Sequence, residues 1–476
     1  MIATMKLTAL ASLLLSFAAP VAAQTLQQRI ETQFAAASPG TRFGLVVADA
    51  EGREIVAIDP DGRFIPASNT KIFTTAAAYM TMADIDKPDT QAGTTVALAG
   101  KDVILTGNGD AQMSSAAACA VNCLATLADA VAAKTRRVRH IIGDASLWPD
   151  QRWGPGMSWN NVAERSGTGI AALSVDSNEV ALTVSPTYGG MFPLVTFPSD
   201  YFTIENQATT IARGPNTLDV KRLPFERRII LFGQIAVGDP VKIIALGIDD
   251  PAHYSAWRLA ALLKERSVRV TGKIRSRYKE EALYRITDPC PKKGCRKFNP
   301  PVMLARLTPP PLAEDIKAIN KISQNQHADM LLRRLGSGAD GGLAVVETML
   351  NKAGVPRTAY DFADGSGMST YNRVAPRGMV RFLRWVAAQP WGAAWLTSLP
   401  IGGVDGTIAN RFKGTALENR IFAKTGGLNA TAALSGHMIA KSGREIIFSL
   451  FANDMPAGTR VQPIMDAALV TIAEAN

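Results

Sequence analysis

The chain has 476 residues, of which 47% are hydrophobic and 19% are charged. That balance, without any low-complexity tract, excludes an intrinsically disordered protein and allows two or three domains of ordinary size. The formal net charge of +10 makes the chain basic, and the excess is concentrated in two segments described below.

The first 23 residues predict a secretory signal peptide. Lys6 precedes an apolar run from Leu7 to Ala19, and small residues lead to Ala23, where we expect cleavage. No later stretch approaches the ~20 consecutive apolar residues of a membrane span. We therefore expect an exported, soluble protein that has no integral membrane anchor once residues 1–23 are removed.

The next residues predict a hairpin and then a helix. Residues 42–59 hold two apolar runs around a turn at 49–52, which is typical of a β-hairpin. In the stretch PASNTKIFTTAAAYM (66–80), apolar residues recur every four positions from Ile72 onward, which predicts a helix.

From about residue 90 the sequence changes to short strand patterns with many glycines and prolines. Two stretches within this part, 127–143 and 259–272, resemble each other, because each runs from a helix pattern to a basic strand and a glycine. The repeat predicts two halves of one subdomain that enclose another subdomain; coincidence is the alternative.

A proline-rich segment, 297–312, indicates a boundary after which helical patterns return. The chain then closes with a strand, a turn and a strand between residues 420 and 454. This outline predicts an α+β fold. Residues 24–89 and 305–476 form one helix-and-sheet domain, and a β-rich insertion of one or two subdomains, 90–304, interrupts it.

The four cysteines form two close pairs, Cys119 with Cys123 and Cys290 with Cys295. In the oxidising compartment that an exported protein reaches, this spacing predicts two local disulfides. A single zinc site that uses all four thiolates is the alternative, which export disfavours.

Basic residues gather between Lys264 and Lys297, where twelve lysines and arginines occur with four acidic residues. A second cluster, KTRRVRH, spans Lys134 to His140. Export and the lack of a base-stacking motif argue against nucleic acid as a partner. The two clusters suit an anionic polymer of the cell envelope, or they are a solvated basic face without a specific ligand.

Three short motifs carry the candidate chemistry. They are SNTK (68–71) at the start of an apolar helix, SQN (323–325) between two helices, and KTG (424–426) at an edge-like strand. Lys71 follows Ser68 by one helical turn, so its amine lies on the same face and can take the proton of the hydroxyl.

Each part of this pattern also has a simpler interpretation. Other copies of the first two motifs, at Ser276–Lys279 and Ser158–Asn160, lack the helical context. Ser68 alone could be a helix cap, which is a common role of serine. His327 is expected to be a partly exposed helix residue, and DGSGMS (364–369) a glycine-permitted turn that borders the site rather than a catalytic element.

In this order the three motifs resemble the signature of the serine enzymes that acylate on penicillin and on D-alanyl-D-alanine. More than half of the chain separates the first motif from the second. This gap, with its β-rich filling, resembles the class C low-molecular-mass penicillin-binding proteins, the D-alanyl-D-alanine carboxypeptidase/endopeptidase family. The stretches 173–182, 364–369 and 402–411 are similar to that family too, so the resemblance covers nearly the whole mature chain.

The resemblance implies a split penicillin-recognising domain and a periplasmic serine carboxypeptidase, also an endopeptidase, that needs no cofactor and no metal. Its substrates would be peptidoglycan stem peptides that end in D-Ala-D-Ala, and β-lactam antibiotics would acylate it. The implied catalytic residues are Ser68, Lys71, Ser323 and Asn325, and the implied substrate-binding residues are Lys424, Thr425, Gly426 and Gly427.

Two positions depart from the family's pattern. Gln324 stands where aspartate is common, and because this position is variable we expect the chemistry to be unchanged. Gly427 stands where a serine or threonine often follows K-T-G, so a hydroxyl that could grip the substrate carboxylate is missing. We also expect burial and the charge of Lys424 to bring the pKa of Lys71 toward ~7–8, where the amine accepts protons.

Two other functions remain as alternatives. A serine β-lactamase would use the same motifs, but the long insertion and the lack of a recognisable deacylating glutamate motif argue against it. A non-catalytic cell-wall-binding module would keep the fold and use the basic segments, but the complete set of motif residues argues against that.

Overall fold

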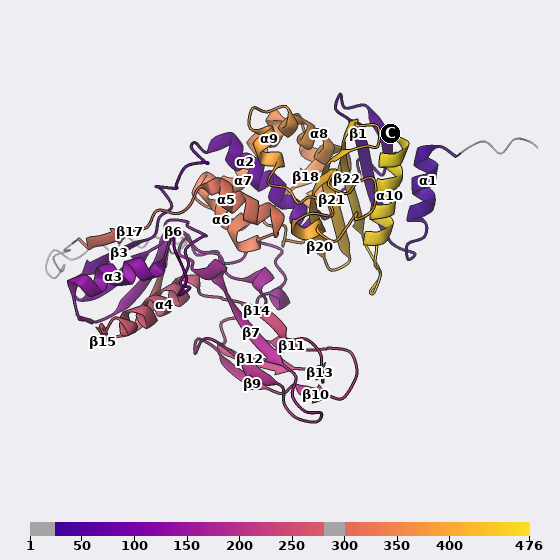
Figure 1. Ribbon diagram of the computed structural model, residues 1–476. Coiled ribbons are helices and arrows are strands. Elements are labelled where there is room, and N and C mark those ends of the chain that lie inside the picture. Colours follow the sequence, from indigo (N-terminus) through magenta and orange to yellow (C-terminus); the bar gives the residue numbers. More distant parts are fainter. Residues whose placement is uncertain (1–23, 280–299) are drawn as a thin grey trace, which may run out of the picture.

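The computed structural model of the protein describes residues 24–279 and 300–476. The predicted signal peptide, the Cys290–Cys295 pair and the basic residues between 280 and 297 lie outside the described residues. Figure 1 shows three lobes: a helix-covered sheet built from both ends of the chain, a second sheet with two helices, and a strand-rich lobe from residues 179–247. No helix in the described part of the chain has the length and hydropathy of a membrane span.

The first lobe is organised around a five-stranded antiparallel sheet in the order β2-β1-β22-β21-β20. Its strands are β1 (Arg42–Asp49), β2 (Glu54–Ile58), β20 (Ile421–Leu428), β21 (Thr431–Ile439) and β22 (Glu445–Asn453). The predicted hairpin is confirmed as β1 and β2. β1 also pairs along its whole length with β22, so the sheet joins the two ends of the chain. β20, which carries K-T-G, is an edge strand as expected.

Helices cover both faces of this sheet, which explains why β1 is almost continuously apolar. Leu45 and Val47 face α1 (Leu26–Phe34) and α10 (Gln462–Ala475). The alternate residues, Val46 and Ala48, pack against helices on the opposite face. Those helices are α2 (Thr70–Thr81), α7 (Ala339–Lys352) and α8 (Pro376–Ala387), with α9 (Gly392–Leu396) beside α8, and α5 (Leu312–Lys321) and α6 (Asn325–Gly336) packing on α2.

The second lobe contains a mixed sheet in the order β16-β6-β4-β3-β17. The strands are β3 (Thr95–Ala99), β4 (Asp102–Thr106), β6 (Ile141–Pro149), β16 (Ile274–Lys279) and β17 (Val302–Arg306). Because β17 pairs with β3, the chain is still part of this sheet when it reaches the proline-rich segment. The exact domain boundaries remain a prediction.

The sequence repeat corresponds to a structural repeat. α3 (Leu124–Lys134) and α4 (Pro251–Glu265) pack together, and the short strands that follow them, β5 (Arg137–Val138) and β15 (Arg269–Val270), pair in parallel. The next strands, β6 and β16, also pair in parallel. The fold therefore brings together the basic cluster that begins at Lys134 and the described part of the one that begins at Lys264.

The third lobe lies between the two repeat halves in the sequence and consists of small sheets. Its strands are β7 (Glu179–Ser185), β8 (Leu194–Thr196), β9 (Thr203–Asn206), β10 (Thr209–Ile211), β11 (Asp219–Lys221), β12 (Arg228–Phe232), β13 (Gln234–Ala236) and β14 (Lys242–Gly247). One sheet has the order β14-β7-β8, and another has the order β11-β12-β9. The expected α+β fold with a β-rich insertion is confirmed.

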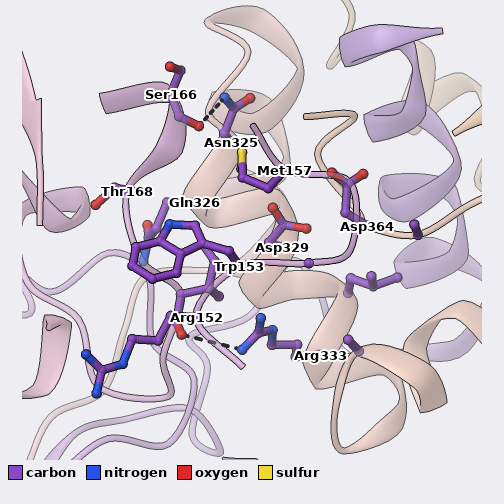
Figure 2. Close-up of a pocket in the computed structure, with 15 residues that line it drawn as sticks. Arg152, Trp153, Met157, Ser166, Thr168, Asn325, Gln326, Asp329, Arg333 and Asp364 are labelled. Atoms are coloured by element: carbon purple, nitrogen blue, oxygen red, sulfur yellow. Dashed lines mark hydrogen bonds between the residues drawn. The ribbon is translucent and has the colours of Figure 1, made fainter. Parts of the chain in front are cut away.

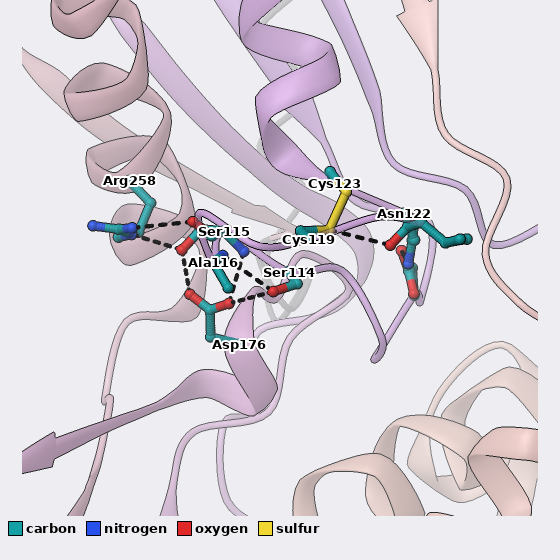
Figure 3. The surroundings of a disulfide bond; sticks show 10 residues. Ser114, Ser115, Ala116, Cys119, Asn122, Cys123, Asp176 and Arg258 are labelled. Carbon is teal, nitrogen blue, oxygen red and sulfur yellow. Dashed lines mark hydrogen bonds between the residues drawn. A yellow bond between two sulfur atoms is a disulfide. The ribbon is translucent and has the colours of Figure 1, made fainter.

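A disulfide joins Cys119 and Cys123 just before α3 (Figure 3). Beside it, Asp176 accepts hydrogen bonds from Ser114 and Ser115, and Arg258 donates to Ser115. The first predicted local disulfide is confirmed. The four-thiolate zinc site is wrong, because this bond consumes two of its ligands.

Candidate active site

Ser68 lies in a short 3₁₀ turn, Ala67–Asn69, that leads directly into α2. Asn69 is the residue that precedes α2, and its side chain makes no capping bond. Ser68 lies one residue earlier, inside the 3₁₀ turn, so it does not cap α2. Instead the Ser68 hydroxyl is 2.9 Å from Lys71 Nζ. Ala67 has a φ of +47°, a strained conformation of the kind that concentrates at functional sites.

Two glycines allow the chain to approach the Ser68 segment from both sides. A Cβ on Gly367 would lie 1.9 Å from the Ala67 carbonyl oxygen, and Gly367 also has a φ of +87°. A Cβ on Gly426 of β20 would lie 2.4 Å from the Pro66 carbonyl oxygen. The turn at 364–369 and the K-T-G strand are therefore in direct contact with the segment that holds Ser68. The expectation that this turn borders the site is confirmed.

The fully buried amine of Lys71 has three hydrogen-bond partners. They are Ser68 Oγ at 2.9 Å, Asn325 Oδ1 at 2.6 Å and the Ser366 carbonyl oxygen at 2.5 Å. The last two partners can only accept. A neutral amine has two N–H groups and one lone pair, so it satisfies both acceptors and keeps its lone pair for the Ser68 hydroxyl. This geometry suits a base.

The side-chain amide of Asn325 is oriented by a residue of the inserted region. Asn325 Nδ2 donates to the Ser166 carbonyl oxygen at 3.0 Å (Figure 2). The Oδ1 of the same amide is the atom that accepts from Lys71. Neither the Ser166 nor the Ser366 carbonyl was found from the sequence, because every residue type has a carbonyl and no motif distinguishes these two.

Burial lowers the pKa of Lys71 to about 8, although the charges of Asp329 and Asp364 raise it. Burial, followed by the charge of Lys71, lowers the pKa of Lys424 well below its ordinary value. Burial is the first cause of the lowered pKa of Lys71, as expected. Repulsion between the two lysines contributes to the lowered pKa of Lys424.

Ser323 and Lys424 form a second hydrogen-bonded pair. Ser323 lies between α5 and α6 with a φ of +61°, and its Oγ is 2.9 Å from Lys424 Nζ. Asn69, next to Ser68, donates to the Lys424 carbonyl oxygen at 2.9 Å. The structure thus brings residues of all three motifs together. The other copies differ, since Ser276 is on strand β16 and bonds Asp250, and exposed Ser158 bonds Asn160.

The edge strand β20 continues from Lys424 through Thr425, Gly426 and Gly427. Thr425 Oγ1 donates to Thr407 Oγ1 at 2.8 Å, so a second hydroxyl, which sequence reasoning missed, lies beside the motif. A Cβ on Gly427 would meet only the Thr431 carbonyl oxygen, at 3.9 Å. Position 427 therefore has room for a side chain.

Gln324 and His327 connect the second motif to its surroundings. Gln324 Nε2 donates to Glu179 Oε1 at 3.0 Å, so this variable position binds the inserted region. The expectation of a partly exposed His327 is wrong, because this side chain is buried. Its Nδ1 is 2.5 Å from Asp315 Oδ1 and its Nε2 is 2.9 Å from Ser177 Oγ.

A small cavity of about 20 Å³ adjoins Asn325 (Figure 2). Its polar lining comes from α6, the inserted region and the turn at 364–369, and includes Asp329, Asp364, Arg333 and Arg152. Within residues 24–279 and 300–476, no three His, Cys, Asp or Glu side chains gather as the ligands of a metal would.

Comparisons with known proteins show which proteins this chain is similar to. The family model described as the D-Ala-D-Ala carboxypeptidase 3 (S13) family matches residues 26–476. A D-alanyl-D-alanine carboxypeptidase from Actinomadura sp. (strain R39) is 30% identical over 476 residues, covering 91% of this chain and 82% of that relative. The crystal structure of penicillin binding protein 4 from Haemophilus influenzae superposes with a TM-score of 0.75 at 21% identity, covering 93% of this chain and 97% of that chain. Another structure of that protein, in complex with a β-lactam, gives a TM-score of 0.68 at 20% identity.

Proposed function

The chain belongs to the D-Ala-D-Ala carboxypeptidase 3 (S13) family of penicillin-binding serine peptidases, and from this membership we propose that Ser68 is its nucleophile. The proposed substrates are peptidoglycan stem peptides that end in D-Ala-D-Ala. The observation that carries the proposal is the set of partners around Lys71 Nζ: two obligate acceptors and the Ser68 hydroxyl.

In the proposed acylation step, Ser68 Oγ attacks the carbonyl carbon between the two terminal D-alanines and its proton passes to Lys71. The backbone N–H groups of Ser68 and Gly427 stabilise the negative oxygen that forms. One donor of this kind is typically worth ~10²–10³ in turnover. The close contact between β20 and the Ser68 segment supports this pairing of donors.

The tetrahedral intermediate then collapses, the peptide C–N bond breaks and D-alanine leaves. Ser323 relays a proton to the leaving amine, and its hydrogen bond to Lys424 supports this relay. Asn325 holds Lys71 and the substrate amide. Water then attacks the acyl-enzyme ester, the shortened peptide leaves and Ser68 regains its proton.

Lys424 and Thr425 bind the terminal carboxylate of the substrate in this proposal. In the free protein, burial and the charge of Lys71 lower the pKa of Lys424. The negative charge of the arriving substrate carboxylate favours protonation of Lys424. β-Lactams carry a comparable carboxylate and amide, so they acylate Ser68 and stall at that stage. We further propose that the protein acts in the periplasm and also cleaves D,D-crosslinks.

The decisive experiment uses the mature protein with fluorescent penicillin and with purified muropeptides, both crosslinked and uncrosslinked. We expect covalent labelling, loss of one D-alanine from uncrosslinked peptides by mass, and separation of crosslinked pairs. Ser68→Ala is expected to abolish all three. Ser276→Ala, in the other S-x-x-K sequence, is the matched control and is expected to leave them unchanged.

Labelling that survives Ser68→Ala would remove Ser68 as the nucleophile. A chromogenic cephalosporin separates the β-lactamase alternative, because we expect a single slow burst and no rapid turnover. A protein that binds cell wall but shows no label and no peptide products would instead be a binding module.

A further inference from the structure

Two carboxyl groups of the candidate site are not used by the proposed mechanism. Asp329 is on α6, one helical turn beyond Asn325, and Asp364 begins the turn at 364–369. Both line the small cavity beside Asn325 (Figure 2). Each affects the charge state of Lys71.

Asp364 serves its own turn. This buried carboxylate accepts hydrogen bonds from Gly367 N at 2.8 Å, Ser369 N at 2.6 Å and Asn372 Nδ2 at 2.7 Å. These bonds close the turn. The carbonyl groups of Gly365 and Ser366 accept hydrogen bonds from Thr74 and Lys71 instead. Asp364 is therefore accounted for as a structural anchor.

Asp329, on α6, is hydrogen-bonded to the same turn at Gly365, the residue before Ser366. Its Oδ1 accepts from Gly365 N at 2.7 Å, and the Gly365 carbonyl oxygen accepts from Thr74 Oγ1 of α2 at 2.9 Å. Gly365 is thus fixed from α6 and from α2. The neighbouring Ser366 carbonyl is the acceptor that takes one N–H of Lys71. A shift of Gly365 would remove that acceptor from reach.

We propose that Asp329 is a positioning residue for Lys71, because it fixes the Ser366 carbonyl through Gly365. Its negative charge also favours a proton on the amine. The inference rests on the proposed function, since it concerns the base of that reaction. Its two effects oppose each other. The hydrogen bond improves the geometry of the base, while the charge raises the pH at which the base becomes free.

The charged groups around this pair come from several elements. The charges of Asp364 in the turn and Arg333 on the same helix act on Asp329, and Arg152 lines the same cavity. The charge of Asp329 acts on Lys71 of α2. Lys71 also lies near Lys424 of β20. Burial, and then the charge of Asp364, raises the pKa of Asp329 to about 6. Near pH 7 Asp329 is therefore mostly charged, and it acts on Lys71 in the range where Lys71 titrates.

The test measures the rate of Ser68 acylation by a chromogenic penicillin from about pH 5 to about pH 10. Asp329→Asn keeps an oxygen acceptor for Gly365 N but removes the charge. We expect its acid limb to move to lower pH by about one unit, because an opposite charge at close range shifts a pKa by that order. Asp329→Glu keeps the charge, and we expect its acid limb to stay where the unchanged protein has it.

Thr74→Val tests the hydrogen-bonded arm separately. It removes the bond to the Gly365 carbonyl and leaves every charge in place, so we expect a lower plateau rate and an unmoved acid limb. This variant keeps the inference testable if Asp329→Asn does not fold. Asp315→Asn removes another buried carboxyl that pairs with His327, and it is the matched control for the pH profile.

An acid limb of Asp329→Asn that coincides with that of the unchanged protein would overturn the charge effect. An unchanged plateau in Thr74→Val would overturn the positioning through Gly365. Failure of the proposed function is distinguished from both results, because penicillin labelling that survives Ser68→Ala would remove Ser68 as the nucleophile before any pH profile is compared.

Discussion

Lys71 and Lys424 have the same side chain and are both fully buried, yet they meet different partners. Lys71 donates to Asn325 Oδ1 and to the Ser366 carbonyl oxygen, and the charges of two aspartates act on it. Lys424 is hydrogen-bonded to Ser323 and is repelled by the charge of Lys71. The neighbouring carboxylates partly offset the cost of burying Lys71, and its pKa remains near 8.

This value predicts the pH dependence of acylation. Lys71 takes up a proton as the pH falls through about 8, and a protonated amine cannot accept the Ser68 proton. We therefore expect the acylation rate by penicillin to be constant above that pH and to fall tenfold per unit well below it. Stopped-flow measurements over a pH series check this. A rate that rises toward acid pH would exclude Lys71 as the base.

Position 427 gives a prediction about substrate binding. Because a Cβ there meets nothing closer than 3.9 Å, Gly427→Ser adds a hydroxyl beside Thr425 without a clash. A hydrogen bond to a charged carboxylate contributes about 1.5–3 kcal/mol, so we expect KM for a D-Ala-D-Ala peptide to fall by roughly tenfold or more, with kcat nearly unchanged.

Two comparisons make this prediction specific. A substrate with a terminal carboxamide lacks the negative acceptor, so its KM should not improve. Thr407→Val removes the hydroxyl bonded to Thr425 and should raise KM for the carboxylate substrate. Equal gains for carboxylate and carboxamide would show that the new serine acts in some other way.

Side chains within ordered motifs were readable from the sequence, and backbone groups were not. The sequence predicted Ser68, Lys71, Asn325 and Lys424 because they occur in three motifs, and the order of these motifs along the chain resembles the signature of one group of enzymes. The carbonyl oxygens of Ser166 and Ser366 have no such signature. Asp329 follows Asn325 by one helical turn, so helical spacing could have identified it, but only the turn at 364–369 explains its use.

At the scale of elements, the parallel pairing of β5 with β15 joins two basic segments that lie far apart in the sequence. Arg137 stands opposite Arg269, and both are exposed. Local periodicity predicted each helix–strand unit, but strand pairing between the units depends on long-range contacts that no window of sequence contains.

This basic surface predicts salt-sensitive binding to anionic wall polymer. Coulomb attraction between exposed charges is screened within a Debye length, so we expect the affinity to fall by roughly tenfold between about 0.05 and 0.5 M salt. The double variant Arg137→Glu and Arg269→Glu should bind weakly at all salt concentrations. Lys352→Glu, an exposed charge on α7, is the control. A flat salt profile would leave the surface as a solvated face.

Another element shows where helix patterns mislead. His327 was expected to be a partly exposed helix residue, but it is buried, and residues of the inserted region bond this part of the helix. Ser177 bonds His327, Glu179 bonds Gln324 and the Ser166 carbonyl bonds Asn325. The pattern of α6 alone could not reveal a partner that comes from another lobe.

At the scale of the whole molecule, the α+β fold and the β-rich insertion were predictable because composition changes sharply near residues 90 and 305. The contribution of the insertion to the site was not. Through Ser166 the insertion orients the amide that binds Lys71, so it contributes a group to the candidate site.

The pairing of β1 with β22 has a consequence for biosynthesis. Because a polypeptide is synthesised from its N-terminus, Ser68 is made early. The strand β22, which pairs with β1, is made after most of the chain. Until then β1 has no neighbour on that side, and K-T-G cannot take its place beside Ser68. On the proposed mechanism, a nascent chain therefore cannot be acylated by penicillin until its C-terminal strands have been made.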